Sequence, residues 1–161
     1  MQCNFTEFEM QKLKNSIDSV FLRVYNLDII NPRGFLMEEF KMKKLNLAII
    51  GQGRSGKDIH GSYYRSELNK YYTVKYVVDW DEYRRNLAKE LYPGCETFSD
   101  YKDLFDKKDI DVVVNVTYSN LHFEISKDLL EHGFNVLSDK PFGRTRFEGE
   151  TLMKIAKDNG C

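Results

Sequence analysis

From residue 45 onward, short apolar runs alternate with longer amphipathic stretches. This alternation is typical of strand and helix units that build a parallel sheet. The runs predict five strands, at residues 45–50, 73–79, 96–98, 111–116 and 134–138. Because a stretch that can form a helix follows each strand, the pattern predicts an α/β fold. Its doubly wound, mostly parallel sheet has helices on both faces and a ligand crevice at the carboxyl ends of the strands.

The helices are predicted from apolar spacing and from residues that begin or end helices. They are expected at residues 54–68, 81–91, 100–105, 120–133 and 146–159. Ser99 and Ser119 are each placed to cap the helix that follows them. Gly133 and Gly160 are placed to end helices, because glycine readily adopts the left-handed conformation of a helix C-terminus.

The first 43 residues follow a different pattern. Their apolar residues between Phe5 and Val24 have roughly helical spacing, and residues 31–34, Asn-Pro-Arg-Gly, predict a turn. One interpretation is a helical extension packed on a domain that comprises residues 44–161. In the other interpretation, residues 1–43 do not belong to the fold and Met42 is the natural start. Sequencing the N-terminus of the natural protein distinguishes the two.

Composition narrows the class of function. Lys and Arg number 24 and Asp and Glu 25, so the net charge of -1 provides no broad field for nucleic acid or an anionic membrane. Cys3, Cys95 and Cys161 have no paired spacing, which argues against a disulfide framework and against a metal site. The sequence also lacks an apolar run typical of a signal peptide or a membrane span. These features favour a compact protein of the cytoplasm.

A glycine-rich segment, residues 51–56, joins the first predicted strand to the first predicted helix and reads Gly-Gln-Gly-Arg-Ser-Gly. In this position G-x-G-x-x-G is the fingerprint of a dinucleotide-binding Rossmann fold. Gly51 permits the tight turn, Gly53 lets the backbone approach a pyrophosphate, and Gly56 lets the helix pack closely on the strand. The phosphates then meet a helix N-terminus, so the segment predicts binding of a dinucleotide such as NAD(H).

Asp79 ends the second predicted strand, and its position beyond Gly56 suits the acidic residue of the fingerprint. A carboxylate there accepts hydrogen bonds from ribose hydroxyls and repels a 2′-phosphate, which favours NAD over NADP. Alternatively, Asp79 only ends the strand or caps the next helix. Arg84 and Arg85 lie nearby and can bind a 2′-phosphate, so NADP remains possible. Trp80, next to Asp79, is counted with the candidates for cofactor binding.

Two further polar segments follow predicted strands and therefore border the same crevice. Residues 117–122, Thr-Tyr-Ser-Asn-Leu-His, have side chains able to contact ribose or nicotinamide. His122 is also a candidate for direct chemistry, although a histidine in a first helical turn is more often structural. Residues 138–143, Ser-Asp-Lys-Pro-Phe-Gly, place Lys140 at the sheet edge. A lysine there can hold the proton of a substrate hydroxyl during hydride transfer, although most lysines are solvated surface charges.

Taken in order, AIIGQGRSG, Asp79, TYSNLH and DKPFG resemble the motifs of the Gfo/Idh/MocA oxidoreductases over residues 44–160. The resemblance implies NAD as the cofactor, with NADP possible, and Lys140 as the catalytic lysine. Tyr118 stands where the family has proline, and Asp139 where it has glutamate, which can change how Lys140 is held. The motifs and the resemblance together give these cofactor-binding candidates: Gly51, Gln52, Gly53, Arg54, Ser55, Gly56, Asp79, Trp80, Thr117, Tyr118, Ser119, Asn120, His122, Asp139, Lys140 and Pro141.

The resemblance also implies a function. We expect the nucleotide-binding part of an NAD(P)-dependent oxidoreductase that transfers hydride between nicotinamide and a sugar, an inositol or a related polyol. Family members continue into a second α/β domain that binds substrate, and residues 44–161 contain no counterpart of it. The alternative is a truncated or stand-alone module that binds NAD(H) without turnover. Apolar surface that the second domain normally covers would then favour self-association into a homo-oligomer.

Overall fold

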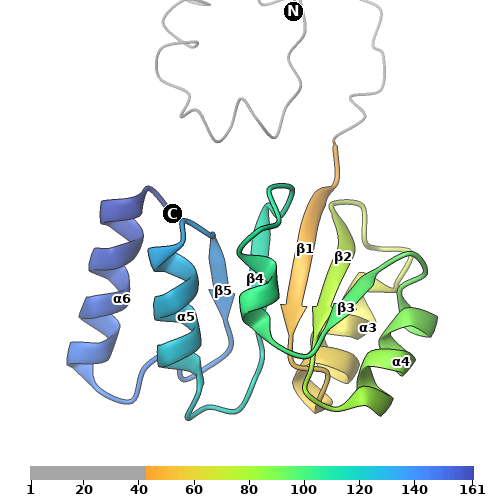
Figure 1. Ribbon diagram of the computed structural model, residues 1–161, viewed down its shortest axis with the longest axis horizontal. Coiled ribbons are helices and arrows are strands. Elements are labelled where there is room, and N and C mark those ends of the chain that lie inside the picture. Colours follow the sequence, from red (N-terminus) through yellow and green to blue (C-terminus); the bar gives the residue numbers. More distant parts are fainter. Residues whose placement is uncertain (1–42) are drawn as a thin grey trace, which may run out of the picture. The chain divides into compact units, whose positions relative to one another are not determined.

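The computed structural model describes residues 43–161, so the predicted helical extension and the alternative start at Met42 lie outside the described residues. Five strands form one parallel sheet in the order β3-β2-β1-β4-β5 (Figure 1). Their bounds are Leu45–Ile50 for β1, Tyr72–Val78 for β2, Glu96–Phe98 for β3, Val112–Asn115 for β4 and Val136–Ser138 for β5. The doubly wound parallel sheet predicted from the sequence is confirmed.

A helical segment follows every strand. The segments are η1 (Arg54–His60), α3 (Gly61–Tyr64), α4 (Glu82–Leu91), η2 (Tyr101–Leu104), α5 (His122–Glu131) and α6 (Arg146–Asn159). The helix expected after β1 begins as a π-helix, η1, and continues directly into the short α3. The segment after β3 is a single 3-10 turn. The last helix spans the residues that its pattern predicts.

Alternating residues of β1 pack into two cores, one on each face of the sheet. Ala48 and Ile50 belong to a core that also contains Leu129 of α5. Leu47 and Ile49 face the opposite core, which includes Ala88 of α4. Because both faces of the strand are buried, the sequence of β1 is a continuous apolar run, as in parallel sheets covered by helices.

The predicted helix caps are partly wrong. Asp100, and not Ser99, caps η2 by accepting a hydrogen bond from the amide of Lys102. Ser119 is exposed in the loop after β4, and α5 begins three residues later without a side-chain cap. The amide of Leu121 instead donates to the carbonyl of Tyr118, so a backbone turn leads into the helix. A cap residue must directly precede the first helical turn, and Ser119 lies too far upstream.

The two glycines predicted to end helices are confirmed by the structure. Gly133 and Gly160 have φ angles of 80° and 71°, and each follows the end of a helix. Cys95 and Cys161 are free thiols, whereas Cys3 lies outside the described residues. Within residues 43–161, no helix combines the length and the apolar character that crossing a bilayer requires.

The core on the α5 face generates a prediction about stability. Leu129→Ala removes a side chain that is fully buried, so we expect it to lower the free energy of unfolding by about 2–5 kcal/mol. Met153→Ala, on the exposed surface of α6, is the control and should change that energy by less than about 0.5 kcal/mol. Urea denaturation of the purified chain measures both. Equal effects of the two substitutions would contradict the assigned core.

Candidate nucleotide-binding site

The glycine-rich loop leaves β1 at the carboxyl edge of the sheet. Gly51 has a φ of 100°, a backbone conformation that favours glycine. A Cβ atom on Gly56 would lie 1.9 Å from the carbonyl oxygen of Gly51 and 3.0 Å from a methyl group of Val116. Neither glycine therefore accommodates a side chain, and together they allow the start of η1 to pack closely against the end of β1.

The start of η1 is open to a ligand. Gly53 is the N-cap residue and makes no side-chain cap, and the first turn contains no acidic residue. The first amides of a helix have no partner within the helix, so they need partners from elsewhere. Among the described residues, a Cβ atom on Gly53 would have one neighbour within 4 Å, the guanidinium of Arg84 at 3.8 Å. The space beside Gly53 is therefore open in front of amides that suit an anion.

Gln52 carries an unsatisfied polar group in the same loop. Its side chain is buried, with 3% of the residue exposed, yet its amide nitrogen and oxygen have no hydrogen-bond partner among the described residues. Buried polar atoms in folded proteins nearly always have partners. The unsatisfied amide therefore fits a loop whose remaining partners come from a bound molecule or from water.

Asp79 ties the end of β2 to the glycine-rich loop. One carboxylate oxygen accepts a hydrogen bond from the amide of Gln52 at 2.7 Å, and the other accepts from the amide of Asp81 at 2.9 Å. Asp81, and not Asp79, is the N-cap residue of α4. Because each carboxylate oxygen has two acceptor sites, one site on each oxygen remains for a ribose hydroxyl.

The two arginines of α4 have different roles. Arg85 donates to the carbonyl oxygens of Asp79 and Trp80, both at 2.8 Å, and so holds the chain after β2. Arg84 places its guanidinium 3.6 Å from the carboxylate of Asp79, on the side of Gly53. Of the pair, Arg84 is the residue that faces the open space beside the loop.

Asn115, at the end of β4, shapes the loop that follows. Its side-chain oxygen accepts a hydrogen bond from the hydroxyl of Thr117 at 2.8 Å, and its nitrogen donates to the carbonyl of His122 and to the hydroxyl of Ser126. Beyond Thr117 the loop is exposed at residues 118–120, Tyr-Ser-Asn. Asn115 thus fixes the base of the loop and leaves its tip open to solvent.

His122 is buried and connects two loops. Its Nδ1 lies 2.8 Å from the carbonyl oxygen of Pro141, and its Nε2 lies 3.1 Å from the carbonyl oxygen of Thr117. Both ring nitrogens therefore face protein backbone, and the exposed fraction of the residue is 2%. These contacts favour the structural role of His122 over direct chemistry.

Asp139 joins the glycine-rich loop to the segment that carries Lys140. Its carboxylate accepts hydrogen bonds from the hydroxyl of Ser55 and from the amide of Lys140, while its own amide donates to the carbonyl of Asn115. The hydrogen bond from Ser55 holds the pKa of Asp139 below its usual value. The side chain of Lys140 is exposed, and a cis peptide bond joins Lys140 to Pro141. The hydrogen bonds of Asp139 thus hold the backbone at Lys140, whose side chain is exposed.

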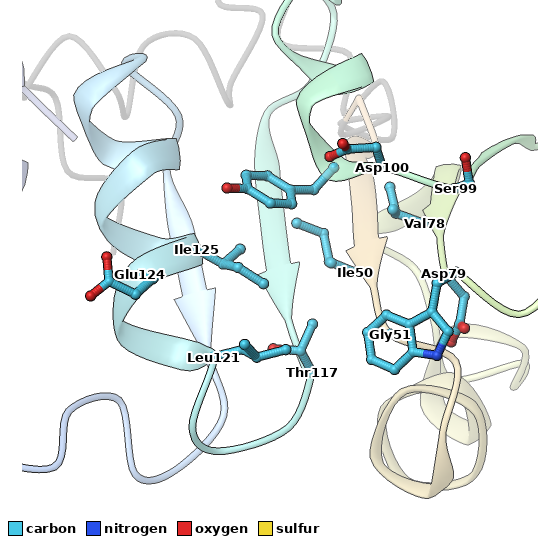
Figure 2. A pocket seen from close by; sticks show the side chains of 12 residues that line it. Ile50, Gly51, Val78, Asp79, Ser99, Asp100, Thr117, Leu121, Glu124 and Ile125 are labelled. Atoms are coloured by element: carbon cyan, nitrogen blue, oxygen red, sulfur yellow. The ribbon is translucent and has the colours of Figure 1, made fainter.

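A pocket of about 310 Å³ opens at the same edge of the sheet. Figure 2 shows Ile125 of α5 pointing toward Ile50 of β1, with Leu121 and Thr117 close to each other below them. The complete lining is Ile50, Gly51, Val78, Asp79, Trp80, Ser99, Asp100, Tyr101, Thr117, Leu121, Glu124 and Ile125.

The pocket contains four of the predicted cofactor residues, namely Gly51, Asp79, Trp80 and Thr117. The sequence reasoning missed its other walls, which come from residues 99–101 and from α5. Residues 99–101 follow β3 directly, so the rule that ligands bind beyond the carboxyl ends of strands was sufficient to find them. Ser119, Asn120 and Lys140 do not line this pocket.

Comparison with known proteins identifies relatives of this fold. The model of an oxidoreductase family with an NAD-binding Rossmann fold, Gfo/Idh/MocA, matches residues 45–161. Scyllo-inositol 2-dehydrogenase (NADP+) of Bacillus subtilis is 28% identical over 120 residues, which are 74% of this chain and 32% of that enzyme. An uncharacterised oxidoreductase of Escherichia coli, YhhX, is 31% identical over 72% of this chain and 33% of its own length. This chain therefore spans about a third of the length of these curated relatives.

Solved structures give the same result. The WlbA dehydrogenase of Chromobacterium violaceum, in complex with NADH and UDP-GlcNAcA, aligns with a TM-score of 0.66 and 26% identity over 73% of this chain and 33% of that one. The myo-inositol 2-dehydrogenase of Lactobacillus plantarum has a TM-score of 0.64 and 27% identity over 73% of this chain and 34% of its own. The family model matches well over half of the residues of this chain. This chain therefore belongs to the Gfo/Idh/MocA oxidoreductases and has their NAD-binding Rossmann fold.

Proposed function

We propose that residues 44–161 form one domain that binds NAD(H) or NADP(H) as the nucleotide-binding part of an oxidoreductase. That oxidoreductase would transfer hydride between nicotinamide and a sugar, an inositol or a related polyol. The observation that carries the proposal is the loop at residues 51–56, where two glycines without room for a Cβ atom precede an uncapped helix start. The substrate class rests on relatives such as the scyllo-inositol dehydrogenase of Bacillus subtilis.

The residues at the sheet edge fit the parts of a dinucleotide. The amides of residues 53–56 would bind the pyrophosphate, because no side chain or acidic group competes for them. Asp79 would accept hydrogen bonds from the adenosine ribose with its two remaining acceptor sites. The polar side chains of Thr117, Ser119 and Asn120 would line the part of the cofactor beyond β4.

Lys140 is the proposed catalytic residue. The nicotinamide ring supplies the hydride chemistry when the cofactor is bound. Asp139 and His122 hold the backbone on either side of Lys140, so its exposed amine can reach a substrate hydroxyl. As the neutral amine it would accept the proton that the hydroxyl loses as hydride leaves for nicotinamide, and the ammonium group so formed would hold that proton beside the new carbonyl oxygen. Asp139 makes the contacts to Ser55 and Lys140 although it is shorter than the glutamate of the family motif.

We propose NAD as the preferred cofactor because Asp79 would repel a 2′-phosphate. Arg84 is the group on the open side of the loop that would accept such a phosphate when NADP binds. Arg84→Ala should therefore weaken NADPH binding and leave NADH binding nearly unchanged, as measured by calorimetric titration of each coenzyme. Equal losses for the two coenzymes would contradict this assignment.

Gly53→Ala tests the proposed contact with phosphate. Gly53 has a negative φ of -72°, and an added Cβ atom would meet no backbone within residues 43–161, so the variant should fold normally. The methyl group would, however, stand where the backbone approaches the pyrophosphate, and we expect NADH affinity to fall about tenfold or more. Gly56→Ala is unsuitable, because its Cβ atom would lie 1.9 Å from a carbonyl oxygen. Fluorescence titration with NADH measures the affinity, and Met153→Ala, on the exposed surface of α6, is the control.

Unchanged NADH affinity in a folded Gly53→Ala variant would remove the main support for the proposal. Its thermal unfolding midpoint, compared with that of the unmodified chain, verifies that the variant is folded.

Lys140→Gln separates catalysis from binding. With NAD+ and a panel of sugars and inositols, the absorbance band of reduced nicotinamide reports any turnover by the unmodified chain. The variant should lower that rate by about 10²-fold or more and retain its NADH affinity, because the amine acts on the substrate oxygen. Binding without turnover in the unmodified chain would favour a module that holds NAD(H) without catalysis. Turnover that survives in Lys140→Gln would exclude the assigned role.

A further inference from the structure

Two large aromatic side chains contact each other in solvent at the edge of the pocket. The ring centroids of Trp80 and Tyr118 are 5.6 Å apart, and the ring planes are inclined by 34°. In spite of this contact, the exposed fractions of the two residues are 53% and 60%. Exposed apolar surface beside a cavity often marks a binding site.

The two rings come from strands that are not neighbours. Trp80 follows the end of β2 and Tyr118 follows the end of β4, with β1 between these two strands. The aromatic pair therefore spans the carboxyl end of β1, where the glycine-rich loop begins. Trp80 also lines the pocket, whose inner wall is formed by apolar side chains of β1, β2 and α5.

We propose that Trp80 and Tyr118 form an aromatic clamp that holds the adenine base of the cofactor between their rings. This inference rests on the proposed function and assigns the two rings to the adenine end of the cofactor. A purine is flat and aromatic on both faces, so two rings that face each other can stack on both sides of it.

The spacing of the rings agrees with a clamp that is closed without its ligand. Aromatic groups in contact are separated by ~3.5 Å, so a base between two rings requires a separation of ~7 Å. The centroid distance of 5.6 Å is shorter than this, and the rings must part by ~1.4 Å. Both side chains are more than half exposed, so the rings have room in solvent to part.

The position of the clamp determines which end of the dinucleotide it holds. Lys140 follows β5, whereas Trp80 follows β2, on the other side of β1 and β4. With the diphosphate at the loop after β1, nicotinamide would extend toward Lys140 and the adenine toward Trp80. Asp79, which is adjacent to Trp80 in the pocket lining, would then meet the adenosine ribose.

The segment after β3 adds polar acceptors suited to this base. Ser99 and Asp100 follow β3 and line the same pocket as Trp80. Adenine carries an exocyclic amine, which donates hydrogen bonds to hydroxyl and carboxylate oxygens. A carboxylate there disfavours a base with a carbonyl at the same position, so the pocket favours adenine over hypoxanthine.

Intrinsic tryptophan fluorescence reports directly on the clamp, because Trp80 is the sole tryptophan of the 161 residues. ADP, which has adenine but no nicotinamide, is titrated into the full chain. Stacking of the base on the indole should quench the emission of Trp80 in a saturable manner. Nicotinamide mononucleotide, the other half of the cofactor, should leave the emission unchanged at the same concentrations.

Variants measure the contribution of each ring. Tyr118→Ala and Trp80→Leu should each weaken ADP and NADH binding about tenfold in calorimetric titrations, since each removes one stacking face. Trp80→Phe restores a ring and should recover most of the affinity. Tyr83→Ala is the matched control, because Tyr83 is an exposed tyrosine of α4 outside the pocket lining. It should bind ADP as the unmodified chain does.

The outcomes separate this inference from the proposed function. NADH binding that is equally strong in the unmodified chain, Tyr118→Ala and Trp80→Leu overturns the clamp and leaves the proposed function intact. Quenching by ADP without any affinity for NADH or NADPH supports stacking of adenine on the two rings but not as part of a nicotinamide cofactor, and it overturns the proposed function. If neither ADP nor the coenzymes bind, both are overturned.

Discussion

The close approach between Gly51 and Gly56 is the constraint on which the nucleotide-binding site depends. A single Cβ atom at Gly56 would overlap the carbonyl oxygen of Gly51, so only glycine allows η1 to start against the end of β1. This arrangement brings the first amides of η1 to the carboxyl edge of the sheet with no capping side chain. Segments after β2, β4 and β5 reach the same edge, because all five strands are parallel.

Contacts between distant segments hold this edge together. Asp79 binds the amide of Gln52, Asp139 binds the hydroxyl of Ser55, and His122 connects the loops after β4 and β5. The glycine-rich loop is thereby linked to the proposed ribose contact and to the proposed catalytic lysine. A change of position at the loop would be transmitted to both groups through one or two hydrogen bonds. Preorganisation of this kind lowers the cost of placing a cofactor and a substrate together.

Much of the fold could be predicted from the sequence, because its signals are local. The apolar run of β1, the period of α6 and the glycines after α5 and α6 each act within a few residues. The predicted caps at Ser99 and Ser119 were wrong. Several polar groups near a helix start compete to cap it, and Asp100 caps η2 while a backbone turn leads into α5. The fingerprint glycines were predictable from a local signal as well, because their spacing and their place between a strand and a helix can be read from the sequence.

The connections within the site could not be predicted in this way. The hydrogen bond from Ser55 to Asp139 and the contact between Trp80 and Tyr118 join residues far apart in the sequence. Such pairs become visible only when the sheet order is known. The unsatisfied amide of Gln52 is likewise a property of its surroundings and not of its residue type.

The central claim is that the amides at the start of η1 bind the diphosphate of a nicotinamide dinucleotide. Amide NMR spectra of the ¹⁵N-labelled chain, recorded during titration with NADH, test it most directly. The account predicts that the largest shifts belong to the amides of Gly53, Arg54 and Ser55. Saturable NADH binding that leaves these three resonances in place, or no binding at all, would contradict it.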